Sequence, residues 1–190
     1  MITAADELEL MTSIAAVAAQ RLGAAACSVA LVEGSELVFV AASGTEAAQV
    51  VGMRIPVGRG IAGWVAASGQ GIAVADVARD QRFDEETALR TGYLPASILA
   101  VPVDSDDGPL GVLEVLDRTP GAHDLEVAGA AARQIALTRL LAEGRSDLDA
   151  ELGDPELAEL LALIGRLRSR TAADRRLAAR LLRAVLEDDA

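Results

Sequence analysis

Glycines divide the middle of the chain, residues 53–118, into short strand and helix signals, and this segment constrains the fold most. Gly58 and Gly60 stand where a strand passes into a helix, and Gly69 stands where that helix ends. Asp84 is a typical helix N-cap, and an acidic turn separates the last two strands. The segment therefore predicts a strand, a helix, a strand, a short helix and two strands, at 53–57, 58–68, 72–75, 85–91, 97–103 and 110–116.

The flanking sequence adds a helix and a hairpin before this segment and a longer helix after it. An apolar stripe at helical spacing ends at Gly23, and Gly34-Ser35 forms the turn between two strands rich in β-branched residues. The expected elements are a helical stripe, two strands and a closing helix, at 8–22, 27–33, 36–43 and about 124–143. Residues 1–145 therefore read as one α+β domain.

The sequence after this domain changes character, and residues 146–190 are expected to form a linker and a two-helix extension. Asp154-Pro155 is a typical helix start, and two amphipathic stripes follow it. Such a C-terminal helical hairpin cannot bury both stripes alone, so it must pack on the domain or on another chain. The stretch Arg166–Arg183 holds seven arginines and one acid. It would either meet an acidic partner or form a solvated face paired with neighbouring acids.

Composition excludes several classes of function. The 17 basic residues are all arginines, so lysine-dependent phosphate loops and Schiff-base chemistry are absent. The net charge of −12 argues against nucleic-acid binding. Cys27 is the single cysteine, which excludes an internal disulfide. No apolar run reaches the roughly 20 residues of a membrane span, and no signal peptide is visible, so we expect a cytoplasmic protein without membrane insertion.

The glycine pattern from Gly58 to Gly63 permits two interpretations. G-x-G-x-x-G after a strand is the dinucleotide-binding fingerprint, and Asp76 stands near the required acidic position. However, the upstream strands form a hairpin, which a parallel nucleotide-binding unit does not contain. The alternative is structural: Gly58 and Gly60 permit a sharp entry into the helix, and Gly63 permits its close packing.

The ordered residues of the middle segment resemble the GAF domain, over roughly residues 4–143. No single short motif among them is diagnostic, but the ordered set is fairly specific. The residues that carry the resemblance are Gly58, Gly60, Ile61, Ala62, Gly63, Trp64, Asp76, Val77, Arg82, Phe83, Ser97, Leu99, Ala100, Val101 and Pro102.

The resemblance implies a PAS-related antiparallel sheet flanked by helices, with a small ligand, often a cyclic nucleotide, held between sheet and helices. Cyclic-nucleotide members carry an N-K-F-D-E signature near the last strand and helix. Asp117-Arg118 stands at the N-K position and the phenylalanine is missing, which argues against such a ligand. Asp124 is expected to pair with Arg118 and keep a structural clasp.

Other chemistries of the family lack their residues here. Bilin and haem attachment need a suitably placed cysteine or histidine, whereas His123 is the single histidine and starts the last helix. Free methionine sulfoxide reductases of this fold use several cysteines. The sequence therefore predicts no catalytic residues and no metal site, and it names no cofactor.

The walls of a ligand site are expected to come from the loop and short helix spanning Asp76–Tyr93 and from the strands beneath. Its arginines would hold a carboxylate or phosphate, or would pair with Asp80, Asp84, Glu85 and Glu86. Its aromatic residues would stack on a ligand or fill the core. The candidate ligand-binding residues are Trp64, Asp76, Arg79, Arg82, Phe83, Arg90, Tyr93 and Ser97.

The sequence thus predicts a non-catalytic regulatory domain that binds a small molecule or a protein partner. It would form a homodimer through its terminal helices and signal in trans. The alternatives are a constitutive dimerisation scaffold whose pocket is filled by side chains, and an enzyme like the free methionine sulfoxide reductases.

Overall fold

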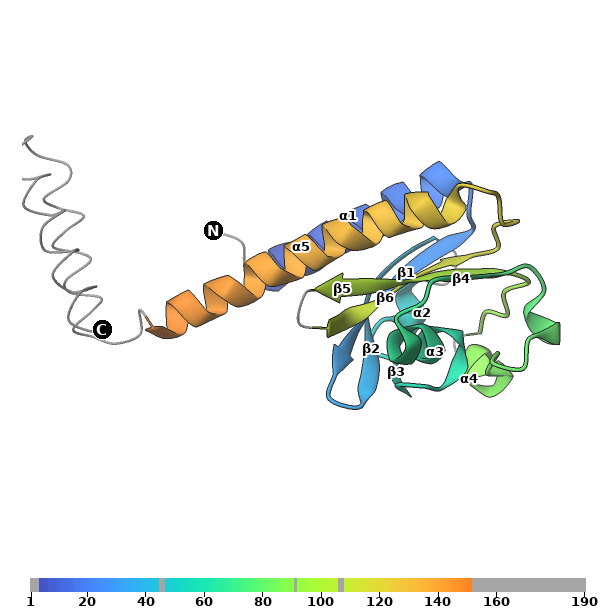
Figure 1. The fold of residues 1–190 in the computed structure, drawn as a ribbon, viewed down its shortest axis with the longest axis horizontal. Coiled ribbons are helices and arrows are strands. Elements are labelled where there is room, and N and C mark those ends of the chain that lie inside the picture. The colour runs from blue at the N-terminus through green and yellow to red at the C-terminus, as the bar shows by residue number, and fades with distance from the viewer. Residues whose placement is uncertain (1–3, 45–46, 91, 106–107, 152–190) are drawn as a thin grey trace, which may run out of the picture. The chain divides into compact units, whose positions relative to one another are not determined.

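A six-stranded antiparallel sheet forms the centre of the molecule (Figure 1). The computed structural model describes residues 4–44, 47–90, 92–105 and 108–151. The order of the strands across the sheet is β3-β2-β1-β6-β5-β4. Their bounds are Ala26–Glu33 for β1, Glu36–Gly44 for β2, Arg54–Pro56 for β3, Ile72–Val74 for β4, Ile98–Ser105 for β5 and Gly108–Leu116 for β6.

Helices cover both faces of this sheet. The helices α1 and α5 lie side by side on one face, and α2, α3 and α4 lie on the other (Figure 1). A short 3-10 turn at Val77–Arg79 follows β4. The helix bounds are Ala4–Leu22 for α1, Ala47–Val50 for α2, Gly60–Ser68 for α3, Glu85–Arg90 for α4 and Asp124–Glu151 for α5. The predicted α+β fold class is confirmed.

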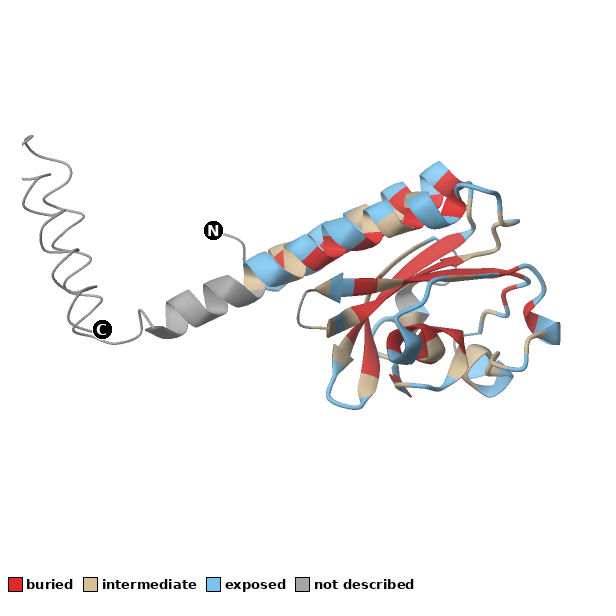
Figure 2. Ribbon diagram, viewed as in Figure 1, coloured by how far each residue is buried: buried red, intermediate tan, exposed pale blue. Residues whose placement is uncertain are grey.

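The first hydrophobic core lies between the sheet and the pair α1 and α5. Successive side chains of a strand point to opposite faces, so β1 sends Val29 toward these helices and Ala30 toward α3. Small residues of α1 and α5, such as Ala15 and Ala132, are buried at this contact. Figure 2 shows the buried inner sides of both helices and of β1. Alanine therefore permits close packing of these helices on the sheet.

The second core lies between the opposite face of the sheet and α3. A Cβ atom on Gly63 would lie 2.8 Å from the carbonyl oxygen of Pro56, so only glycine fits this close approach. Gly58 and Gly60 adopt φ angles of 90° and 71°, which side chains disfavour. The structural interpretation of these glycines is therefore confirmed. The described strands pair only antiparallel, so the dinucleotide-binding alternative is wrong.

Three local features differ from the sequence prediction. Neither the four-residue helix α2 nor the 3-10 turn at Val77–Arg79 was expected. The polar stretch after Gly144, expected to be a linker or a frayed helix, continues α5 to Glu151. The chain divides into two compact units, 1–142 and 143–190. The predicted two-helix extension at 154–190 lies outside the described residues and stays a prediction.

Within the part of the chain that the structure describes, no helix combines the length and the apolar character needed to cross a bilayer.

Candidate functional site

A cavity of about 110 Å³ opens between the sheet and α2, α3 and α4. One water needs roughly 10–15 Å³ of cavity volume, so the cavity is large enough for several waters or a compact organic molecule. Its walls are mainly apolar. The lining residues are Ala26, Cys27, Ser28, Phe39, Ala42, Ser43, Ala47, Val50, Met53, Ile55, Gly60, Ile61, Ala62, Phe83, Asp84, Thr87, Ala88, Tyr93, Pro95, Ile98, Glu114 and Leu116.

Glu114 is the buried acid of this cavity, at 8% relative exposure. It lies on the central strand β6, directly opposite Ser28 of β1 and Ala100 of β5. Burial raises its pKa to about 7, and a hydrogen bond with the side chain of Ser28 opposes this rise. Glu114 therefore changes its charge near neutral pH, unlike an exposed glutamate.

Two further ionisable groups of the cavity stay protonated at neutral pH. Burial, with the nearby Glu114, raises the pKa of the Cys27 thiol to about 12. Burial and a hydrogen bond to Asp117 raise the pKa of Tyr93 to about 12, and the Tyr93 hydroxyl donates that bond to Oδ2 of Asp117. A thiolate nucleophile is therefore not available at this cysteine.

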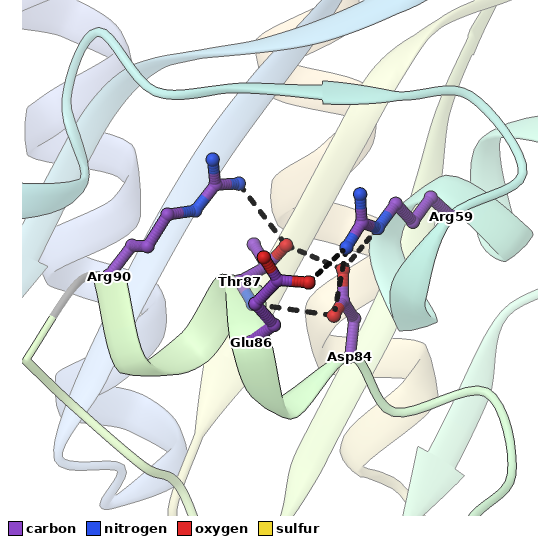
Figure 3. Close-up of polar contacts among 5 residues, drawn as sticks. All are labelled: Arg59, Asp84, Glu86, Thr87 and Arg90. Atoms are coloured by element: carbon purple, nitrogen blue, oxygen red, sulfur yellow. Dashed lines mark hydrogen bonds and ion pairs between the residues drawn. The ribbon is translucent and has the colours of Figure 1, made fainter.

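Five polar residues join the start of α3 to α4, and we call them the Arg59 clasp: Arg59, Asp84, Glu86, Thr87 and Arg90 (Figure 3). Arg59 Nε lies 2.5 Å from Asp84 Oδ2, and Arg59 Nη2 lies 3.1 Å from Glu86 Oε2. Asp84 caps α4 by accepting the Thr87 amide and hydroxyl at 3.3 and 2.5 Å.

The electrostatics of Asp84 follow from these contacts. The hydrogen bond from the Thr87 side chain and the ion pair with Arg59 lower the pKa of Asp84, so it stays ionised at neutral pH. Asp84 and Thr87 also line the cavity. The Arg59 clasp therefore supports one cavity wall.

The structure separates the eight candidate ligand-binding residues into two groups. Phe83 and Tyr93 line the cavity. The residues that do not line it are Trp64, Asp76, Arg79, Arg82, Arg90 and Ser97. A ligand contact by any of the eight stays a prediction.

The three candidate arginines make contacts within their own loop and helix. Arg79 pairs with Asp76 at 3.2 Å on the exposed surface. Arg82 makes a two-pronged contact with Asp80, at 2.8 and 2.6 Å, and lies 4.7 Å above the Trp64 ring. This contact lowers the pKa of Asp80 to about 2.

Arg90 completes the set by donating to the Thr87 hydroxyl at 3.3 Å. The alternative of local pairing therefore describes Arg79 and Arg82, although the acid that holds Arg79 is Asp76.

Ser97 and the segment after β6 form a separate polar cluster. Ser97 Oγ donates to the carbonyl oxygen of Arg118 at 2.9 Å. Arg118 Nε lies 3.0 Å from Asp124 Oδ2, so the predicted clasp between these two residues is confirmed. His123 is exposed and lies 3.4 Å from Glu126. Among the described residues, no group of three or more potential ligands is arranged to hold a metal ion.

Comparison with known protein families identifies the family to which this fold belongs. A sequence model of the GAF domain matches residues 6–138. The chain belongs to the GAF domain family. GAF domains are commonly regulatory or sensory, and typically non-catalytic. This GAF domain is 38% identical over 79 residues to the cGMP-specific 3',5'-cyclic phosphodiesterase of Drosophila melanogaster, a match covering 38% of the chain and 7% of that relative.

Solved structures share the fold of this GAF domain. The GAF domain of a Coxiella burnetii phosphoenolpyruvate-protein phosphotransferase has a TM-score of 0.66 at 20% identity, covering 74% of this chain and 86% of that one. The GAF-B domain of DevS from Mycobacterium smegmatis has a TM-score of 0.62 at 24% identity, covering 75% and 99%.

An enzyme is also among these similar structures. Free methionine-R-sulfoxide reductase of Neisseria meningitidis, solved with its substrate, has a TM-score of 0.62 at 24% identity, covering 74% of this chain and 81% of that one. At these identities the likeness shows the fold alone. The matched phosphodiesterase shares only one stretch with this GAF domain, so the activity of that whole protein does not transfer.

Sequence reasoning missed Glu114, although a signal was present. The strand Gly108–Leu116 reads GPLGVLEVL, with one acid among apolar residues. A charged residue at an inward-facing strand position is rarely buried without a role. Asp84 was predicted as a helix cap within the segment expected to form the cavity wall, but it was not named among the candidate ligand-binding residues.

Proposed function

We propose that this GAF domain is a non-catalytic regulatory module that binds a small molecule in the cavity beneath α3 and α4. The observation that carries the proposal is a mainly apolar cavity that holds a buried, titratable carboxyl group, that of Glu114. Such sites combine apolar contact area with a few polar groups that orient a ligand. Perturbed carboxyl groups cluster at functional sites for the same reason.

The sheet offers a direct route from the cavity to α1 and α5. On β1, Ser28 lines the cavity while Val29 belongs to the core beneath these helices. On β6, Glu114 likewise lines the cavity, and the next residue, Val115, belongs to the core beneath α1 and α5. A ligand that shifts either strand therefore changes the packing of α1 and α5 on the opposite face.

The exposed sides of α1 and α5 support dimerisation as the second part of the proposal. Large apolar side chains remain exposed there, at 40–65% relative exposure. Burying such residues against a second copy is favourable. They are Leu8, Leu10 and Val17 on α1, and Leu125, Leu137, Leu140 and Leu141 on α5. The dimer would then pass the signal in trans to a protein partner.

A constitutive scaffold would use the same helices without the cavity, so cavity occupancy separates the two functions. The reductase alternative has less support, because Cys27 is the single cysteine and burial keeps its thiol protonated. That enzymatic cycle requires a second thiol to resolve the oxidised one.

Native mass spectrometry of the freshly purified protein tests the proposal. We expect a dimer that carries additional mass, and this mass is lost on denaturation. An apo dimer that also fails to bind any member of a metabolite collection would favour the scaffold. A monomer under the same conditions would refute dimerisation but not ligand binding.

A further inference from the structure

The ionisable groups that line the cavity have one sign. Among the described lining residues, Asp84 and Glu114 are acids, Cys27 and Tyr93 are neutral when protonated, and none is basic. The guanidinium groups nearest to the cavity belong to the Arg59 clasp, where they bind Asp84, Glu86 and Thr87. The described residues that line the cavity therefore offer hydrogen-bond acceptors and negative charge, but no cationic side chain.

The two acids differ in how their charge is balanced. Asp84 has an arginine at 2.5 Å and two donors from Thr87. Glu114 lies opposite Ser28 on β1 and Ala100 on β5, and the apolar Ile61 and Ala62 of α3 line the same cavity. Only the Ser28 side chain opposes the effect of burial on Glu114. Among the described residues that line the cavity, none supplies a counter-charge to its carboxylate.

We infer that the cavity selects a compact cationic ligand with N–H donors, and that Glu114 supplies the counter-charge at its floor. This inference rests on the proposed ligand-binding function and specifies its chemical class. A buried carboxylate is costly until a cation with hydrogen-bond donors meets it, so such a ligand relieves an existing penalty. An anion would add a like charge beside Glu114 and Asp84.

The remaining walls limit the shape of that ligand. Phe39 and Phe83 contribute aromatic surface, and Ile61 and Met53 contribute aliphatic surface. An apolar body attached to an amidinium or ammonium head satisfies both kinds of wall. A nucleoside phosphate does not, because none of the described lining residues is a cation for its phosphate.

Three probes of one shape test this inference: benzamidinium is a cation, benzamide is neutral and benzoate is an anion. Binding is measured by NMR on the full chain, from the shifts of the Ile61 and Met53 methyl groups, which line the cavity. We expect benzamidinium to bind at least about tenfold more tightly than benzamide near pH 8, and benzoate not to bind.

The pH dependence identifies the group responsible. Between about pH 5.5 and 8, Asp84 stays ionised and Cys27 and Tyr93 stay protonated, so Glu114 is the cavity group that titrates. Benzamidinium affinity should rise about tenfold or more over this range as Glu114 loses its proton. In Glu114→Gln the affinity should be weak and independent of pH.

A second variant keeps the test valid if the glutamine protein does not fold. Ser28→Ala removes the hydrogen bond that opposes the raised pKa of Glu114, so the rise in affinity should occur at higher pH. Equal binding of benzamide or benzoate at the same methyl groups would overturn the inference while ligand binding by the cavity stood. A flat pH profile for benzamidinium would also overturn it. If none of the three probes binds, the inference is also overturned. Native mass spectrometry then remains the independent test of the proposed function.

Discussion

Replacing Glu114 by glutamine should stabilise the protein at alkaline pH relative to acidic pH. Glutamine keeps the shape of the side chain and a hydrogen-bond partner for Ser28, but it cannot carry the buried charge. The raised pKa means that folding opposes ionisation of Glu114. The penalty is therefore absent where the carboxyl is protonated in both states, and it grows as pH rises from the unfolded to the folded pKa.

The magnitude follows from the two pKa values. A rise from 4.5 to about 7 corresponds to about 3 kcal/mol when ionisation is complete in both states. With these values the penalty is about 1 kcal/mol near pH 5 and about 3 kcal/mol near pH 8. The advantage of Glu114→Gln over the wild type should therefore grow by about 2 kcal/mol between these conditions, or roughly 4–8 °C in Tm.

Urea unfolding of both proteins at the two pH values measures this difference, because constant effects of the substitution cancel between them. Glu9→Gln is the matched control, since Glu9 is exposed on α1 and its replacement should give a flat difference. A difference for Glu114→Gln that stays within about 0.5 kcal/mol across this range would refute the argument. So would a difference that falls as pH rises.

Three further predictions concern the cavity, the Arg59 clasp and the dimer. Ala42→Leu should fill the cavity and abolish the additional ligand mass seen by native mass spectrometry. The free energy of unfolding should change by less than about 1.5 kcal/mol. Ala67→Leu, at an exposed position, is the control. Arg59→Ala should make the amides of α4 exchange hydrogen roughly threefold to tenfold faster, by mass spectrometry; Arg79→Ala, which removes an exposed pair, is its control. Leu141→Glu should weaken the dimer at least about tenfold, by analytical ultracentrifugation, because dimerisation would bury an unpaired charge.

Each of these has an outcome that would contradict it. Retention of the ligand mass by Ala42→Leu would place the ligand elsewhere. Unchanged exchange in Arg59→Ala would mean that packing alone holds α4. An intact Leu141→Glu dimer would move the interface to another surface. The C-terminal extension is then the next candidate, and deletion of residues 154–190 tests it.

Secondary structure was predictable from the sequence wherever a local signal was strong. Gly23 and Gly69 end α1 and α3 near the expected positions, because a left-handed residue terminates a helix. Asp84 caps α4 as its side chain predicts. The helix α2 has only four residues and lacks the periodicity on which a prediction depends. After Gly144 the polar sequence left a linker and a frayed helix as alternatives, and α5 continues there to Glu151.

The site was less predictable because it depends on which residues the sheet brings together. The sequence left open whether the loop arginines would bind a ligand or pair with nearby acids, and an acid two or three residues away pairs with Arg82 and Arg79. Glu114 carries no local motif, and its burial results from the pairing of β6 with β1 and β5. Phe83 and Tyr93 reach the cavity because the loop that carries them folds over it.

The contact between Arg82 and Trp64 provides the protein with an optical reporter. Trp64 is the single tryptophan, so the tryptophan fluorescence of the chain originates on α3, one residue beyond Gly63, which packs tightly. The Arg82 guanidinium lies 4.7 Å from the centre of its ring, in cation–π contact, and Asp80 pairs with that guanidinium. Because the pKa of Asp80 lies at about 2, this arrangement persists at all pH values where the cavity titrates. A change in emission at those pH values therefore reports movement of the loop that carries Arg82.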